Sequence, residues 1–350
     1  MARILYGVHG IGHGHAVRAL TIARHFPEHE FLFVSHDTGA AILGQEFPVE
    51  ECPNPPTIIR GHRVDIAATL MASFKVRCQS RRYLRHVLDL MDRFQPDVTM
   101  SDYEYFLPQA ARRAGVPCLS TDHQHIITLC RHPVPWSQYF SYLSTSIAVG
   151  SLFSRATDFL VISFFKAPVK PGARAKILPP LLRESVRERR PSLGDHVVAY
   201  QGYATFKRFF PFLSAIPSKV MVYGFNEERT EGNLLFKKDS ETGFLDDLSS
   251  CRYVVCGGSH TLVSEALFYG KPVISFPIKN AFEQFLNAFY LERLGYGRYF
   301  TGFHPQPEII PAFEANLDLY RANLRAGNFC GNQEIFALVD QFIREKKLDY

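Results

Sequence analysis

Residues 3–26, RILYGVHGIGHGHAVRALTIARHF, begin an α/β domain. An apolar run leads into a turn in which glycine and histidine alternate, and apolar residues at helical spacing follow. Glycine-rich turns between a first strand and a first helix typically bind phosphate, because the backbone N–H groups at a helix N-terminus point outward. The stretch therefore predicts a strand, a ligand-binding turn and a helix, and its three imidazoles need a separate explanation.

The composition indicates a globular protein with two domains. The chain has 350 residues, of which 46% are apolar, and a net charge of +5. No apolar run approaches the length of about 18 residues that a membrane span needs. The N-terminus enters strand-like sequence directly, so we expect no secretory leader. The seven cysteines form no C-x-x-C pair, which is typical of reduced thiols and predicts a cytoplasmic protein.

Strand-like and helix-like segments alternate along the whole chain, which favours two α/β domains with parallel sheets covered by helices on both faces. The strand patterns lie at 2–8, 31–35, 96–102, 116–124, 196–202, 218–225, 252–258 and 271–278, and the helix patterns at 16–26, 74–94, 106–115, 205–215, 244–250, 260–270 and 281–295.

A change in composition marks the predicted boundary between the domains. Residues 166–195 are rich in proline and basic side chains and are interpreted as the interdomain connection. The N-terminal domain is therefore expected over 1–165 and the C-terminal domain over 196–330. Residues 331–350 are expected to form a last helix that packs back on the N-terminal domain.

The turn that begins at Gly10 departs from the dinucleotide-binding fingerprint. G-x-G-x-x-G requires a third glycine where His15 stands, although Asp37 occupies the place of the ribose-binding acid. The turn reads G-x-G-x-G-H-x-x-R and ends at Arg18. A nicotinamide or flavin enzyme is thus an alternative, and we expect no cofactor.

His15 is the best candidate for a catalytic base. It lies at the start of the predicted helix, where the helix dipole favours a neutral imidazole that can accept a proton. His13 is a second candidate, and His9 a weaker one. Asp102 and Asp122 each end a strand, where they can orient His15, act as the base, or simply cap a turn.

A second glycine turn lies in RYVVCGGSHTLVSEALFYGKPVISFP, residues 252–277. It predicts an anion site at a helix N-terminus, with hydroxyl and imidazole donors beside the glycines. The residues of this site are Gly257, Gly258, Ser259, His260 and Thr261.

Polar residues further along suit a sugar nucleotide. Glu265 lies in an apolar helical frame, and its carboxylate can accept both hydroxyls of a ribose. Glu283, Gln284 and Asn287 fall within one turn of the next helix, so that at least two can face one ligand with several hydroxyl groups. The alternative for these three residues is a solvated helix face.

These motifs resemble those of the GT-B nucleotide-sugar glycosyltransferases. Residues 256–295 are similar to the donor-binding domain of the group that contains the N-acetylglucosaminyltransferase of peptidoglycan synthesis. The turn at 10–18 and residues 95–125 are similar to the acceptor-side domain of that group. The resemblance implies two Rossmann-like domains whose parallel sheets face across a cleft.

The resemblance also implies roles for individual residues. The diphosphate of a donor, a UDP-sugar by this likeness, would lie on Gly257, Gly258, Ser259 and His260, with Gly12 and Gly14 of the opening turn adding to the anion site. Glu265 would hold the ribose, and Glu283 with Gln284 the transferred sugar. The pair Glu-Gln leaves the identity of the sugar open.

The predicted reaction moves a hexose from the nucleotide sugar to an acceptor, with inversion and without a metal ion. The acceptor is a glycan, a lipid-linked molecule or a small molecule. The sequence has no D-x-D motif, and helix N-termini can stabilise the leaving diphosphate. The alternatives are a nucleotide-sugar hydrolase or epimerase on the same architecture, and a non-catalytic binding subunit. A zinc site formed by His13, His15, His123 and His125 is a further alternative.

Basic residues gather in the segment that follows Phe74. They are Lys75, Arg77, Arg81, Arg82 and Arg85, beside Leu84 and Leu88. Little aromatic interleaving accompanies them, so we expect no nucleic-acid partner. A solvated helix face, peripheral contact with an anionic membrane, and contact with an anionic acceptor are the three interpretations.

Overall fold

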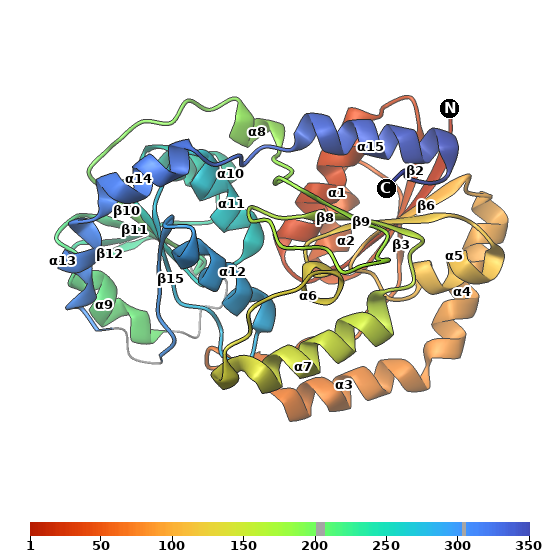
Figure 1. Cartoon of the computed structure of the whole chain (residues 1–350), viewed down its shortest axis with the longest axis horizontal. Helices are drawn as coiled ribbons and strands as arrows, with labels where there is room; N and C mark the ends of the chain where they lie inside the picture. Colours follow the sequence, from red (N-terminus) through yellow and green to blue (C-terminus); the bar gives the residue numbers. More distant parts are fainter. Residues whose placement is uncertain (201–206, 303–305) are drawn as a thin grey trace. The chain divides into compact units, whose positions relative to one another are not determined.

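The structure is a computed structural model that describes residues 1–200, 207–302 and 306–350. It divides into two compact units (Figure 1). Unit 1 comprises Met1–Ile58, Asp65–Arg183 and Cys330–Tyr350, and unit 2 comprises Ile59–Val64 and Glu184–Phe329. Each unit is built on a seven-stranded sheet with helices packed against it, which confirms the predicted α/β class with two Rossmann-like domains.

The sheet of unit 1 has the order β3-β2-β1-β6-β7-β8-β9, and all its neighbouring strands are parallel. The strands are β1 (Arg3–Val8), β2 (Glu30–Ser35), β3 (Val49–Glu51), β6 (Val98–Asp102), β7 (Cys118–Asp122), β8 (Asp158–Ile162) and β9 (Ala175–Leu178). The chain leaves β1 toward one edge and returns at β6 on its other side. Open parallel sheets bind ligands at the carboxyl end of such a reversal.

Alternate side chains of β1 enter two different cores of unit 1. Ile4, Tyr6 and Val8 pack with α1 and α15, whereas Leu5 packs with α4 and α5 on the opposite face. Figure 1 shows α15, the last helix, next to α1, and the rings of His25 and Phe336 stack between the two helices with centroids 3.6 Å apart.

The helices of unit 1 come from three parts of the chain. They are α1 (His13–His25), α2 (Asp37–Leu43), α3 (Ile66–Cys78), α4 (Ser80–Phe94), α5 (Leu107–Ala114), α6 (Ile126–Leu129), η1 (Trp136–Gln138), α7 (Tyr139–Ala148), η2 (Val149–Phe153) and α15 (Asn332–Glu345). The single helix expected over 74–94 is interrupted at Gln79, which separates α3 from α4. Among the helices described, none is long and apolar enough to cross a membrane.

Unit 2 repeats the same plan. Its sheet has the order β12-β13-β11-β10-β14-β15-β16, with only β12 antiparallel to its neighbour. The strands are β10 (Val197–Tyr200), β11 (Val220–Tyr223), β12 (Arg229–Glu231), β13 (Leu234–Phe236), β14 (Val254–Cys256), β15 (Val273–Ser275) and β16 (Gly297–Tyr299). Here the order reverses between β10 and β14.

The helices of unit 2 surround a core rich in phenylalanine. They are α8 (Glu184–Arg187), η3 (Lys207–Phe209), α9 (Phe210–Ser214), α10 (Glu241–Ser250), α11 (His260–Phe268), α12 (Phe282–Arg293), α13 (Ile309–Glu314) and α14 (Leu317–Arg325). The end of the strand expected over 196–202 and the start of the helix expected over 205–215 lie outside the described residues.

Two short segments differ from the predicted domain plan. The stretch 166–195, expected to be a connection, contains β9, which pairs with β8 at the edge of the first sheet. Unit 1 therefore continues to Arg183. The hairpin of β4 (Ile59–Arg60) and β5 (Arg63–Val64) belongs to unit 2, although the chain on both sides of it belongs to unit 1.

Candidate active site

A buried carboxylate organises the carboxyl edge of the sheet in unit 1. Asp102 is the last residue of β6 and is fully buried. Its Oδ1 lies 2.6 Å from Nδ1 of His15, and it accepts two hydrogen bonds from Arg18, at 2.9 Å from Nε and 2.8 Å from Nη2. Both partners come from the start of α1, three residues apart and therefore on one helix face.

The hydrogen bonds define the tautomer of His15. An ionised carboxylate only accepts hydrogen bonds, so the proton between Asp102 and His15 belongs to Nδ1 of the imidazole. Nη2 of Arg18 also lies 3.0 Å from this nitrogen, and one of its two protons is donated to Oδ1 of Asp102. In the neutral imidazole with this tautomer, the lone pair lies on Nε2 of His15, a side chain that is 13% exposed.

The three histidines of the turn occupy different environments. Gly12, with φ at 85°, is the N-cap of α1, and His13 behind it is exposed. His9 is buried, with its ring in edge contact with the rings of His15 and His36 at 5.1 and 5.4 Å. Burial, followed by the like charge that His15 and His36 carry when protonated, holds the pKa of His9 well below its ordinary value. His9 is thus a neutral packing partner.

The loop after β6 is held in place beside this cluster. Tyr103 has a φ of 55° and stacks on Phe153 with ring centroids 4.0 Å apart. Glu104 is buried and accepts hydrogen bonds from the backbone of Phe106 and Leu107 at the start of α5. Burial raises the pKa of Glu104 to about 7, against the effect of these hydrogen bonds. The loop therefore limits the movement of the strand end that carries the site.

Asn54 connects this cluster to the segment after β3. Its Nδ2 donates to Nδ1 of His9 over 3.3 Å, and its Oδ1 accepts from the backbone N–H of Tyr105. Sequence reasoning did not find this residue, since no motif surrounds it and its partners lie 45 and 51 residues away.

Asp122 belongs to a separate pair. Its carboxylate accepts from Nδ1 of His125 at 2.6 Å and from the hydroxyl of Ser120 at 2.5 Å. Burial opposes its ionisation, but the His125 charge and the hydrogen bonds outweigh it and hold the pKa of Asp122 well below its usual range. Of the two aspartates considered as partners for His15, the structure brings Asp102 to it.

His123, the other histidine of the pair His123 and His125, contacts a different group from Asp122. Nδ1 of His123 is 2.8 Å from the carbonyl oxygen of Ile162. Within the part of the chain that the structure describes, no group of three or more His, Cys, Asp or Glu side chains is arranged to hold a metal ion.

The glycine turn of unit 2 lies at the equivalent edge of its own sheet. It connects β14 to α11, and Gly258 has a φ of 92°. A side chain at this position would be strained and would also approach Ser275 Oγ and the carbonyl oxygen of Gln284 to 3.1 Å. Ser259 is the N-cap of α11 and makes no side-chain hydrogen bond to the first turn. The turn therefore presents backbone N–H donors of the kind that bind anions.

The residues predicted to contact the diphosphate differ in exposure. Ser259 is exposed, Gly257 and Thr261 are half-buried, and His260 is buried, with its Nε2 3.4 Å from the Ser264 hydroxyl. Gly14 lies in the first turn of α1 in unit 1.

The residues predicted to contact the ribose and sugar also differ in their surroundings. Glu265 is buried on α11, whereas Glu283 and Gln284 are half-buried in the first turn of α12. Gln284 accepts the backbone N–H of Ile278 with its Oε1. Asn287 is fully buried and donates to the carbonyl oxygen of Gly258 over 3.1 Å, so it supports the glycine turn. Its contact with a sugar remains a prediction.

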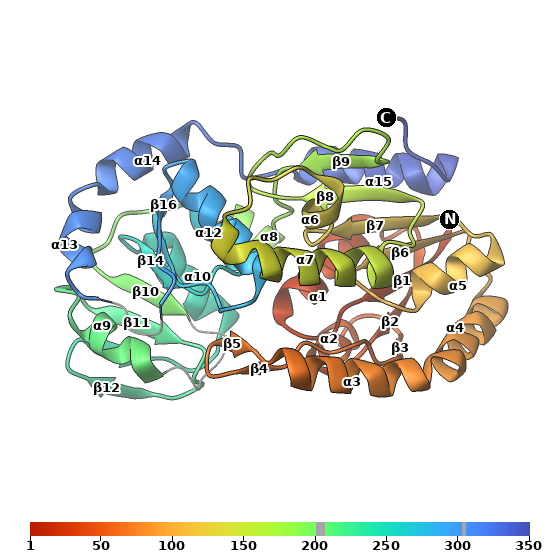
Figure 2. The ribbon, with the colours of Figure 1, turned by 60° about the horizontal axis from the view of Figure 1, so that its bottom comes forward.

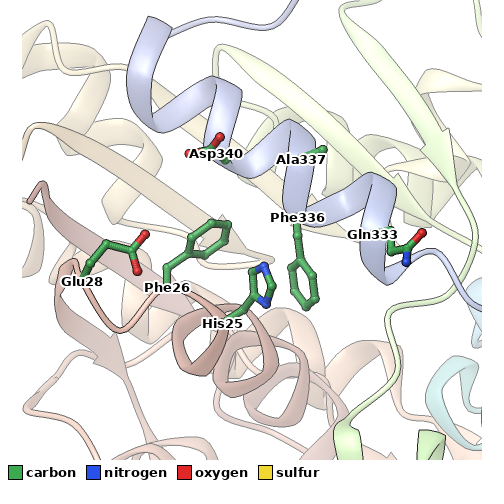
Figure 3. Close-up of a pocket in the computed structure, with 7 residues that line it drawn as sticks. All are labelled: His25, Phe26, Glu28, Gln333, Phe336, Ala337 and Asp340. Atoms are coloured by element: carbon green, nitrogen blue, oxygen red, sulfur yellow. The ribbon is translucent and has the colours of Figure 1, made fainter.

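A surface depression of unit 1 is lined by none of these residues. It measures about 460 Å³ and lies between α1 and α15 (Figure 3). Its lining consists of His25, Phe26, Glu28, Gln333, Phe336, Ala337 and Asp340. The stacked rings of His25 and Phe336 are part of this lining, and His15, Arg18 and Asp102 are not.

Two parallel-sheet units, each with a glycine turn at the carboxyl edge of its sheet, define a protein of the GT-B class. The chain belongs to glycosyl transferase family 1, whose model matches residues 2–318. It is therefore a glycosyltransferase, and the predicted resemblance is confirmed. An uncharacterized glycosyltransferase of Methanosarcina acetivorans is 25% identical to it over 352 residues, which cover 89% of this chain and 86% of the relative.

Solved structures share the fold at low sequence identity. UGT2 of Phytolacca americana, complexed with UDP-2fluoro-glucose and pterostilbene, is 12% identical with a TM-score of 0.68, covering 98% of this chain and 100% of that one. MurG of Acinetobacter baumannii is 15% identical with a TM-score of 0.62, and SsfS6 of Streptomyces sp. SF2575, complexed with thymidine diphosphate, is 18% identical with a TM-score of 0.58. Each covers 97% of this chain and 100% of its own.

The buried ion pair predicts a large loss of stability on substitution of Asp102. Asp102→Asn leaves the buried Arg18 guanidinium without its carboxylate, which costs about 3–5 kcal/mol in the free energy of unfolding. Asp37→Asn is the matched control, because the Asp37 side chain is 70% exposed beside His36 and its loss is expected to change stability by less than about 0.5 kcal/mol. Urea denaturation measures both. Equal effects of the two substitutions would contradict the ion-pair interpretation.

Proposed function

We propose that the protein transfers a sugar from a UDP-sugar to a hydroxyl group of an acceptor, with inversion and without a metal ion. The observation that carries this proposal is the bond between Nδ1 of His15 and Asp102. It leaves Nε2 of the same imidazole as a proton acceptor, at the edge of a parallel sheet where such folds bind their ligands.

The chemical step follows from this tautomer. Nε2 of His15 takes the proton of the acceptor hydroxyl while the oxygen attacks the anomeric carbon. The bond from that carbon to the diphosphate oxygen breaks, and its electron pair leaves with the nucleoside diphosphate. Asp102 then stabilises the imidazolium, as an aspartate does beside a catalytic histidine. A single displacement by a base-activated hydroxyl inverts the configuration at the anomeric carbon.

Unit 2 supplies the donor site in this proposal. The first turn of α11 binds the diphosphate through backbone N–H groups, with Ser259 and Thr261 as hydroxyl donors. Such fixed dipoles stabilise the charge that develops on the leaving group. Glu265 holds the ribose, and Glu283 with Gln284 the transferred sugar. Gly12 and Gly14, which belong to unit 1, are also proposed to contact the donor diphosphate.

UDP is proposed because of the resemblance to nucleotide-sugar glycosyltransferases. The proposal assigns no residue to contact with the nucleotide base. The Phytolacca americana structure carries UDP-2fluoro-glucose, whereas the SsfS6 structure carries thymidine diphosphate. Each binding experiment therefore compares UDP with thymidine diphosphate.

Substitution of the base tests the chemical step. His15→Ala is expected to lower kcat by about 100- to 10,000-fold, the usual contribution of general-base catalysis, with little change in donor affinity. His13→Ala is the matched control, because His13 lies in the same helical turn but is exposed. The assay follows UDP release from UDP-glucose and UDP-N-acetylglucosamine with sugar, lipid-linked and phenolic acceptors.

Two outcomes of this assay would contradict the proposal. Near-normal kcat in His15→Ala would remove His15 from the chemical step. Stoichiometric release of free sugar by the wild type, at one rate with or without acceptor, would identify a hydrolase instead.

Paired substitutions test the donor site. Glu265→Ala is expected to weaken UDP binding by about 1.5–3 kcal/mol, the range for hydrogen bonds to a charged group. Glu283→Ala is expected to leave UDP binding unchanged and to impair turnover, because it would contact only the transferred sugar. Isothermal titration calorimetry with UDP, and with thymidine diphosphate for comparison, measures both affinities, and the rate of UDP release measures turnover. An unchanged affinity in a folded Glu265→Ala variant would exclude Glu265 from the ribose site.

Chelation tests metal independence. Activity is expected to persist in EDTA, because helix N–H donors take the role of a cation at the diphosphate. The measurement is the rate of UDP release before and after exhaustive dialysis against EDTA. Loss of activity that magnesium, manganese or zinc restores would contradict this part of the mechanism.

A further inference from the structure

Exposed apolar side chains gather on two helices of unit 1. Of the 14 large hydrophobic residues that are exposed in the described chain, eight lie in α3 or in the segment of η1 and α7. They are Leu70, Met71, Phe74, Trp136, Tyr139, Phe140, Leu143 and Ile147. Clusters of this kind on a water-soluble surface mark interaction sites.

Each set forms a continuous stripe. Leu70 and Phe74 are four residues apart on α3, a helix without a single buried residue. Phe140, Leu143 and Ile147 lie on one face of α7 at spacings of three and four residues, and Trp136 in η1 precedes Phe140 by four residues. Figure 1 shows both helices along the lower edge of unit 1. In Figure 2, where that edge comes forward, α7 lies in front of the sheet and α3 runs along the lower border of the unit.

The exposed stripe of α3 continues into basic residues on α4. Arg81, Arg82 and Arg85 are exposed there, and together with His86 and Asp89 they line a surface depression of about 360 Å³. The sequence from Ile66 to Leu88 contains five basic residues and no acidic one. Residues 123–157, which include α7, contain two arginines and no acidic residue. The apolar face is therefore bordered by positive charge.

We propose that this face, the stripes of α3 and α7 with the arginines of α4, docks on the surface of an anionic lipid bilayer. Apolar side chains enter the headgroup boundary, and the arginines bind lipid phosphates. Trp136 and Tyr139 suit this role, because both residue types concentrate at membrane interfaces. A second copy of the chain would bring the same positive charges together, whereas an anionic bilayer complements them.

The only tryptophan of the chain reports directly on this contact. Trp136 is 90% exposed, so its fluorescence is expected to shift to shorter wavelength when it enters lipid. The full-length protein is titrated with phosphatidylcholine vesicles that contain 30% or no phosphatidylglycerol, at low and high salt. Binding to the anionic vesicles only, weakened by salt, is the expected result. No substrate is present, so the outcome does not depend on the proposed glycosyl transfer.

Matched variants locate the contact. Phe74→Ser and Phe140→Ser each remove one apolar side chain and are expected to weaken vesicle binding about tenfold or more. Leu319→Ser, at a residue that is exposed on unit 2, is the control and is expected to have no effect. The triple variant R81Q/R82Q/R85Q is expected to lose about 100-fold in affinity at low salt, about fivefold for each charge. Its control is R112Q/R113Q on α5, where both arginines are exposed.

Four results would overturn the proposal. The first is an unchanged Trp136 spectrum with anionic vesicles, and the second is equal binding to neutral and anionic vesicles. The third is a loss of binding in the control variants as large as that in the test variants. The fourth is a wild-type dimer in sedimentation that Phe140→Ser converts to monomer without lipid, because a second copy would then cover the face.

Discussion

The buried charge of Asp102 is the constraint on which the arrangement of unit 1 depends. A carboxylate that is fully removed from water needs compensating partners, and Arg18 and His15 supply them from one face of α1. Arg18 cannot move away without leaving the charge of Asp102 uncompensated. The parallel pairing of β1 with β6 brings the two chain segments together, and it places the network where the strand order reverses. A fixed tautomer of His15 is the chemical consequence.

The two units use one structural device in different ways. In each, a strand ends in a glycine turn and a helix begins at the carboxyl edge of a parallel sheet. The first turn of α1 presents side chains, because His15 and Arg18 both contact Asp102. The first turn of α11 presents its backbone, because Gly258 brings the chain close to α12 and Asn287 fastens the turn. In the proposed function, the base therefore comes from unit 1 and the anion site from unit 2.

The sequence allowed the chemistry-bearing residues to be found individually but not their partners. Glycine turns and helical spacing are local patterns, so the sequence alone was enough to single out His15 and the turn before α11. The bond from Arg18 to Asp102 joins residues 84 positions apart and depends on the sheet order, which no local pattern specifies. Edge strand β9 has only four residues and lies in a segment rich in proline and basic residues, a composition that predicts a connection instead of a strand. Helical spacing grouped Asn287 with Glu283 but could not show that its amide is directed at the glycine turn.

The central claim is that Asp102 orients His15 as the base. It is tested most directly by determining which ring nitrogen of His15 carries the proton. The nitrogen chemical shifts of His15, measured by NMR in protein labelled with ¹⁵N-histidine and assigned by comparison with His15→Ala, report which ring nitrogen carries hydrogen in the neutral imidazole. The structure predicts a protonated Nδ1 and an unprotonated Nε2, which is the atom that would accept the proton of an acceptor hydroxyl. A neutral imidazole protonated at Nε2 would contradict the account, because Asp102 would then not orient the base.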